Sequence, residues 1–325
     1  MVFSASAQFE TRKLYYTLER TSPTEMKSLS FSVTPLSIDL YDPNYSLGIQ
    51  LGAEYHIKNI LIIGARLNRA YADRGKENYN PSMESAQGTS IYKSQPYTNL
   101  DVYGQFLFNS KIKQVKQLVS LETKDNVDYA TKIPLKRLET YSIRFGYNTN
   151  YFWANSDGGA TYRLNGYKIN FDDKYIEKLE GGTMIKNDAL TFGSSRIRKY
   201  DLKVKLNQGY GYREISYKTE IYFDVIYAFS QKLQNMVVTK EYEFDDNGNL
   251  VDFGGTNFKT LNMEYNVDDN TTKTPYGFRV GYRYTDLKKF GWCYGIETGF
   301  RPGPGEMIYN WYLAINIGMS FGVGI

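Results

Sequence analysis

The sequence predicts an all-β protein, an antiparallel transmembrane β-barrel of about ten strands with long extracellular loops. Apolar and polar residues alternate over many segments, so each strand would have one apolar face for lipid and one polar face for a lumen. The chain has no apolar run that approaches the roughly 20 residues needed by a membrane-spanning helix. The connections between the predicted strands are alternately short and long, as in outer-membrane barrels.

A short segment precedes the first strand. Met1–Gln8 contains Ala5-Ser6-Ala7, a small-x-small pattern like that of a signal-peptidase site. We therefore interpret residues 1–7 as the remnant of an export signal peptide and residues 8–325 as a single outer-membrane β-barrel domain. The alternative is an ordinary terminus that is rich in alanine and serine.

Ten spanning strands are expected along this domain. They are predicted at residues 27–40, 45–57, 59–71, 97–109, 137–149, 196–207, 214–229, 275–286, 290–300 and 309–323. In the second of these, apolar residues alternate from Leu47 to Ile57, whereas Glu54 and His56 have the opposite parity. Tyrosine is abundant, with 31 residues, and aromatic side chains suit both strands and membrane interfaces.

The segment between the fourth and fifth strands, residues 110–136, is too long for an ordinary periplasmic turn. It contains the apolar residues Ile112, Val115, Leu118 and Val119 among lysines. Two interpretations fit this pattern: a short amphipathic helix, or an extension of the two flanking strands.

The three longest connections are residues 72–96, 150–195 and 230–274, and all fall on one side when both termini lie in the periplasm. That side is expected to be extracellular, because barrels of this kind have their longer loops outside. Within the last connection, Asn247-Gly248 lies between two alternating segments and predicts a hairpin that projects beyond the membrane. The stretch from Tyr151 to Tyr162 is expected to be exposed loop.

The last three strands place aromatic residues at both predicted membrane interfaces. Tyr276, Phe300 and Trp311 would lie towards the outer rim, whereas Tyr284 and Trp292 flank a periplasmic turn. The final strand has one parity of large apolar residues and one parity of small or polar residues. This separation is typical of a strand between lipid and a lumen.

The Ala-x-Ala-Gln start, the tyrosine-rich strands and the glycine-rich final strand resemble small outer-membrane β-barrel proteins of Bacteroidota, which are Gram-negative bacteria. The resemblance covers nearly the whole chain in style, and no family-specific motif is present. It implies a position in the lipid of the cell outer membrane and insertion by the barrel-assembly machinery. It implies no substrate. The chain ends in Gly324-Ile325, where many outer-membrane proteins of other phyla end in an aromatic residue.

The sequence predicts neither an enzyme, a cofactor site nor a nucleic-acid-binding surface. The one histidine, His56, is predicted at the periplasmic end of its strand, far from the outer rim where a protease or lipase site would need it. The Asp/Asn cluster at residues 245–249 lacks the spacing of a calcium loop, so no metal site is expected. The net charge of +4 is spread along the chain without a basic stripe, and the single Cys293 permits no internal disulfide.

Charged residues recur on the parity that faces the predicted lumen. These candidate lumen-lining residues are Glu54, Arg66, Asp101, Arg144, Asp201, Lys203, Lys218, Glu220, Asp224, Arg279, Arg283 and Glu297. We expect opposite charges to pair across the narrow interior, because an unpaired charge in a confined lumen is costly. The leading hypothesis is therefore a non-enzymatic structural or interaction protein with a largely closed lumen.

This hypothesis implies two classes of partner, and one alternative function is also considered. The protein would be a subunit of an envelope assembly, and its outer loops would bind an envelope protein or a surface glycan. The alternative is a narrow channel for small polar solutes, in which the inward charges set selectivity.

Overall fold

The computed structural model describes most of the chain. The described residues are 2–6, 13–20, 23, 29–41, 44–57, 60–73, 96–124, 127–155, 182–206, 212–233, 236–244, 250–251, 257–265, 273–304 and 310–323. Within them, no helix is both long and apolar enough to cross a membrane. The predicted hairpin turn at 245–249 and most of the loop at 72–96 lie outside the described residues.

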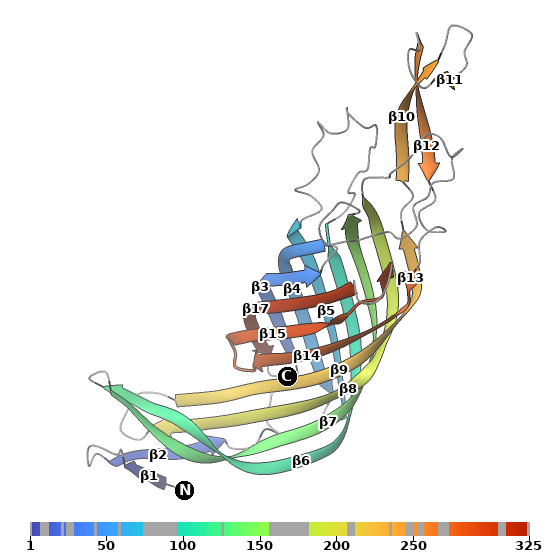
Figure 1. Cartoon of the computed structure of the whole chain (residues 1–325). Helices are drawn as coiled ribbons and strands as arrows, with labels where there is room; N and C mark the ends of the chain where they lie inside the picture. Colours follow the sequence, from blue (N-terminus) through green and yellow to red (C-terminus); the bar gives the residue numbers. More distant parts are fainter. Residues whose placement is uncertain are drawn as a thin grey trace.

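Ten strands of the described part of the chain close into an antiparallel barrel, which confirms the predicted fold class and strand number. In barrel order they are β3 (Leu29–Tyr41), β4 (Asn44–Ile57), β5 (Leu61–Asp73), β6 (Thr98–Lys124), β7 (Val127–Asn155), β8 (Gly182–Leu206), β9 (Tyr212–Leu233), β14 (Tyr276–Asp286), β15 (Gly291–Phe300) and β17 (Trp311–Val323). The ladder between β17 and β3 closes the sheet (Figure 1).

The two ends of the barrel differ. The long connections after β5, β7 and β9 all leave from one end, which we call the loop end and which lies at the top of Figure 1. The opposite end, called the extension end, carries the start of β3, the end of β17 and the tight turn between β14 and β15. The structure therefore has the predicted arrangement, with the long connections together and the two barrel termini opposite them.

The outer face of the barrel is apolar and exposed on every side. Large exposed side chains alternate along the strands and form a belt that includes Phe31, Leu51, Ile63, Leu67, Val102, Phe106, Ile143, Phe145, Phe192, Ile221, Phe223, Val225, Val280, Ile296 and Ile317. A continuous apolar surface of this extent is far larger than water-exposed proteins carry. The pattern is that of a barrel wall in contact with lipid.

Aromatic rings border this belt at both ends. Trp311 is exposed near the loop end, where the predicted outer rim lies. Near the extension end, a ladder of stacked rings crosses β8, β9, β14 and β15 at centroid separations of 4.5, 5.2 and 4.8 Å, formed by Tyr200, Tyr217, Tyr284 and Tyr294. Tyrosine and tryptophan concentrate where a bilayer meets water, so the two aromatic zones delimit a membrane-spanning height.

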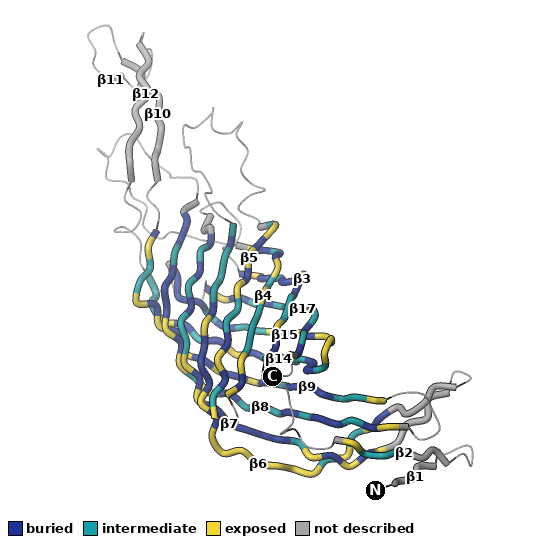
Figure 2. Tube along the Cα trace, turned by 180° about the vertical axis from the view of Figure 1, so that it is seen from behind, coloured by how far each residue is buried: buried dark blue, intermediate teal, exposed yellow. Residues whose placement is uncertain are grey.

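Strands β6 to β9 continue beyond the extension end and form a curved sheet outside the barrel, which we call the extension (Figures 1 and 2). Residues 110–124 belong to β6 and residues 127–136 to β7, so the strand interpretation of this segment is correct and the helix interpretation is wrong. The change from barrel wall to extension occurs at a bulge between Phe108 and Lys111. Asn109 has a φ of 49° there, a conformation that asparagine tolerates better than most residues.

The prediction of a loop over residues 150–195 was wrong at both ends, residues 150–155 and 182–195, whereas residues 156–181 lie outside the described residues. Both β7 and β8 reach into this range and pair with each other there. The stretch from Tyr151, expected to be exposed loop, is likewise strand at its start. The lipid-facing signal in this part of β8 is short, because only Leu190 and Phe192 are large and exposed, while Gly193 and its neighbours are small or polar. Because the alternation in this part of β8 is short and lies among small residues, the sequence analysis predicted a loop there.

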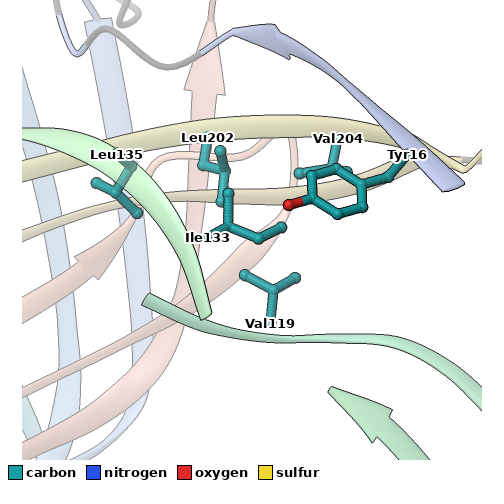
Figure 3. Close-up of a cluster of buried hydrophobic side chains, with 6 residues drawn as sticks. All are labelled: Tyr16, Val119, Ile133, Leu135, Leu202 and Val204. Atoms are coloured by element: carbon teal, nitrogen blue, oxygen red, sulfur yellow. The ribbon is translucent and has the colours of Figure 1, made fainter. Parts of the chain in front are cut away.

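The extension has a hydrophobic core of its own. Strand β2 (Lys13–Arg20) pairs with β1 (Val2–Ser6) on one side. On its other side it pairs with the last residues of β8, which no longer pair with β7. Side chains from β2, the β6–β7 hairpin and β8 meet in this core, shown in Figure 3, and they are Tyr16, Val119, Ile133, Leu135, Leu202 and Val204. The predicted signal-peptide remnant overlaps β1, and its cleavage stays a prediction.

A second, separate sheet lies in the connection after β9, as the sequence predicted. It contains β10 (Met236–Phe244), β11 (Leu250–Val251) and β12 (Asn257–Tyr265). The chain returns to the barrel through β13 (Lys273–Thr274), which pairs with β16 (Gly303–Pro304). At the base of this connection Gln231 Nε2 donates to the carbonyl of Thr274 at 3.0 Å, so its two ends lie side by side.

Candidate functional site in the lumen

The lumen has two unlike walls. Strands β3, β4, β15 and β17 present mostly small residues to the interior, such as Ser32, Gly52, Gly295 and Ser320. Strands β5, β6, β7, β9 and β14 present arginine, lysine, tyrosine and carboxylate side chains instead. Long side chains from one wall can therefore extend across the interior, because the facing wall leaves room for them.

Eight charged side chains of alternating sign form a continuous chain through the lumen. In order of contact they are Glu220, Arg144, Asp224, Arg279, Asp101, Arg66, Glu54 and Lys218. Four are acids and four are bases, so the chain is neutral as a whole. Neutrality and close contact offset the cost of removing these charges from water.

The central links of this chain have short, well-defined contacts. Arg144 Nε donates to Asp224 at 3.0 Å, and Arg279 Nε donates to the other oxygen of Asp224 at 2.8 Å. Arg279 also donates through Nη2 to Asp101 at 3.1 Å, which joins β14 to β6 across the interior. Arg66 Nη1 lies 3.7 Å from the same carboxylate of Asp101.

The last link spans the full width of the barrel. Glu54 on β4 pairs with Lys218 on β9, and four strands separate β4 from β9 in either direction around the barrel. Both side chains are largely buried, so this ion pair crosses the barrel between protein groups.

Two tyrosine rings fill space between the charges. Arg66 Nη2 donates to the hydroxyl of Tyr103 at 2.6 Å, and the Arg66 guanidinium lies 4.4 Å from the centre of the Tyr103 ring. The rings of Tyr103 and Tyr222 lie directly over Gly64 and Gly281 of neighbouring strands, so that a Cβ at either glycine would collide with the ring. Glycine is required at these two positions because the rings approach the backbone so closely.

The loop end of the lumen is capped. Arg301, which follows β15, donates to both oxygens of Asp39 at 3.1 and 2.7 Å, and the Tyr97 hydroxyl donates to the same carboxylate at 2.6 Å. Tyr41 on β3 and Phe152 on β7 meet edge to face with ring centres 5.0 Å apart. These side chains come from different parts of the wall, so among the described residues they narrow the mouth of the lumen.

The extension end is closed by a mixed polar and apolar layer. His56 Nδ1 lies 2.9 Å from Lys199 Nζ at the extension end of β4, the end that the sequence predicts to face the periplasm. Beside this pair, Ile62, Leu107 and Ile197 form a buried apolar cluster. Across the described residues, no group of three or more His, Cys, Asp or Glu side chains is arranged to hold a metal ion.

The structure places ten of the twelve predicted lumen residues inside the barrel, and the other two in the extension. Lys203 pairs with Glu19 of β2 at 3.1 Å, outside the lumen, and Asp201 is buried beside it in the extension. The prediction was wrong for these two because β8 was taken to end inside the barrel, whereas it continues into the extension, past its last pairing with β7 at Arg137 and Tyr200.

Sequence reasoning missed four residues that help to close the lumen. Tyr103 and Tyr222 have the inward parity, which could have identified them, but tyrosine was assigned as a group to the membrane interfaces. Asp39 lies in a predicted strand without a visible partner, and Arg301 lies in a predicted turn. Their pairing depends on a turn that folds into the barrel mouth, for which the sequence carries no signal.

Described residues of the lumen line two small cavities. Their volumes are about 60 and 40 Å³, which is room for a few water molecules each. Both lie along the wall of small residues, and Gln50, Arg66, Arg283 and Asn316 line both. The two arginines therefore stand between the cavities.

Comparisons with known proteins add little to this description. No family model matches the chain, and no curated protein matches it. Among solved structures, an anion-selective porin from Comamonas acidovorans is similar over 91% of this chain and 100% of its own, with 8% sequence identity and a TM-score of 0.17. The assignment of the fold therefore comes from the strand pairing itself.

Proposed function

We propose that this chain is a non-enzymatic β-barrel of the cell outer membrane that acts as a structural or interaction subunit of the envelope. The observation that carries this proposal is the neutral chain of eight charges that spans the lumen. Its members are held by one another, so the interior serves to stabilise the wall. The apolar belt between two aromatic zones supports the membrane location.

A second candidate function is a narrow channel for small polar solutes. The specific observation in its favour is that the two cavities lie along the same wall and are separated by Arg66 and Arg283. Movement of these two side chains would join the cavities into one path. In that case their positive charges would favour anions.

Single-channel recording in planar bilayers separates the two candidates. Refolded protein, shown to be inserted by its heat-dependent mobility in gels, is expected to give no discrete conductance steps. The double variant Arg66→Ala, Arg283→Ala is expected to conduct, because it removes both side chains between the cavities. Arg69→Ala is the matched control, since Arg69 lies on the same strand as Arg66 but is exposed outside the barrel. Salt-dependent steps from the parent protein would refute the closed barrel and favour the channel.

A further inference from the structure

Among the described residues, one backbone edge of β6 is without a partner strand in the extension. β5 pairs with β6 only from Arg69↔Thr98 to Leu61↔Phe106. Beyond the bulge, β6 pairs with β7 on one side, and no described strand pairs with the other side of residues 109–124. An edge of this kind presents unpaired N–H and C=O groups to any extended segment that lies beside it.

The two faces of the β6–β7 hairpin differ sharply. One face, with Ile133 and Leu135, is buried in the core of the extension and holds the hairpin in place. The opposite face is exposed, and Ile112 and Leu118 on it are 55% and 60% accessible. Residues paired directly across an antiparallel ladder share a face, so this surface also includes Lys116, Lys132, Pro134 and Lys136. It combines positive charge with accessible apolar side chains.

The hairpin is basic over residues 109–119 and 132–139, whereas residues 120–131 contain the acids Glu122, Asp125 and Asp128. Its described side chains, at residues 109–119 and 132–139, include Lys111, Lys113, Lys116, Lys132, Lys136 and Arg137. The one acid among them, Glu139, is buried. Lysine on an edge strand opposes pairing with a second copy of the same edge, because like charges would lie side by side. The same charge attracts an acidic strand.

The extension already contains one strand added in this way. β2 pairs with the edge of β8 that becomes available where β7 diverges. Figures 1 and 2 both show β6 at one border of the extension. A further strand could therefore lie beside it without displacing a described strand.

The geometry points to strand addition at residues 109–119 of β6 by an extended, acidic segment of another envelope protein. Main-chain hydrogen bonds to the free edge would supply affinity, and the lysines with Ile112 and Leu118 would select alternating acidic and apolar side chains. This inference rests on the proposed function and deepens it by giving the class of partner and the place where it binds.

The test uses the full-length protein in detergent and a fluorescein-labelled ten-residue peptide of alternating Asp and Val. The peptide is expected to bind, and the same peptide with every backbone nitrogen methylated is expected to bind at least tenfold more weakly. The triple variant Lys116→Glu, Lys132→Glu, Lys136→Glu is expected to lose at least tenfold in affinity. The matched control Lys232→Glu, Lys289→Glu reverses two exposed lysines elsewhere and should bind like the parent.

Three outcomes would overturn the inference. Equal binding of the methylated peptide would mean attraction by charge alone, without strand pairing. Equal binding by the triple variant would place the peptide elsewhere. A parent dimer in sedimentation that the triple variant abolishes would assign the edge to a second copy of this chain. Conductance is measured separately, so a conducting protein that still binds the peptide would refute only the closed barrel.

Discussion

At the scale of single residues, the buried arginines decide whether the barrel interior is stable. Arg144 is the largest of the fully buried side chains in the described structure, and its guanidinium contacts both Glu220 and Asp224. Removing one partner of a buried ionic pair leaves the other charge unpaired and usually costs about 3–5 kcal/mol. We expect Arg144→Ala to lower the free energy of unfolding by about this amount, measured by urea titration of protein folded into lipid vesicles.

The control for this prediction is an ion pair whose cation is accessible to water. Lys186 lies 3.2 Å from Asp188, but its side chain is exposed. Lys186→Ala is expected to leave the unfolding curve unchanged, because water screens such pairs. A similar small effect of Arg144→Ala would show that water enters the lumen and that the ionic chain does not stabilise the wall.

The sequence predicted inward charges well but could not predict their partners. Strand parity alone assigns Arg279 and Asp224 to the lumen, since neighbouring residues on a strand face opposite sides. Which acid meets which base depends on barrel closure and on strand register, as the contact of Arg279 with Asp101 across the interior illustrates. Parity gives no information about residues in turns, such as Arg301, because alternation between two faces holds only along a strand.

At the scale of strands, the ends were harder to predict than the membrane-spanning parts. Alternation between large apolar and polar residues is long and regular where one face of a strand meets lipid. In the extension both faces meet protein or water, so the pattern across 110–136 also suits a helix. Pairing with β7 and the core around Ile133 decide in favour of strand there.

The extension contains one carboxylate whose ionisation should affect its stability. Glu139 accepts hydrogen bonds from Lys113 and Arg137 at 3.0 and 3.3 Å and also contacts Arg196. Burial alone would raise the pKa of Glu139, but hydrogen bonds from Lys113 and Arg196 lower it to about 2. A lowered pKa in the folded state stabilises the fold above the ordinary value of 4.5, and this contribution is lost as pH falls towards 2.

We therefore expect cleavage of the extension by pepsin to be slow at about pH 4.5 and to accelerate as the pH falls to about 2, relative to an unfolded reference substrate in the same tube. Glu139→Gln should be cleaved faster at about pH 4.5 and should show little further acceleration. Identical profiles for parent and variant would mean that this carboxylate does not hold the hairpin in place.

At the scale of the whole molecule, the barrel and the sheet of β10, β11 and β12 are separate units. That sheet shares no backbone pairing with the barrel in the described structure. The connection that carries it is closed at its base, where Lys273 Nζ also donates to the carbonyl of Gln231 at 3.2 Å. A loop whose ends already lie together can be shortened at little cost in chain entropy.

Replacing residues 235–271 by a short Gly/Ser linker should therefore leave the barrel folded. The temperature of its heat-dependent mobility shift in gels is expected to change by only a few degrees, because every barrel ladder is retained. The matched comparison is Gly281→Val. It changes a single residue, but the new side chain forces the Tyr222 ring from its position in the lumen. It should lower stability by about 1–3 kcal/mol. If the loop deletion were the more damaging change, the sheet after β9 would be part of the barrel's folding unit, and the separation of the two would be wrong.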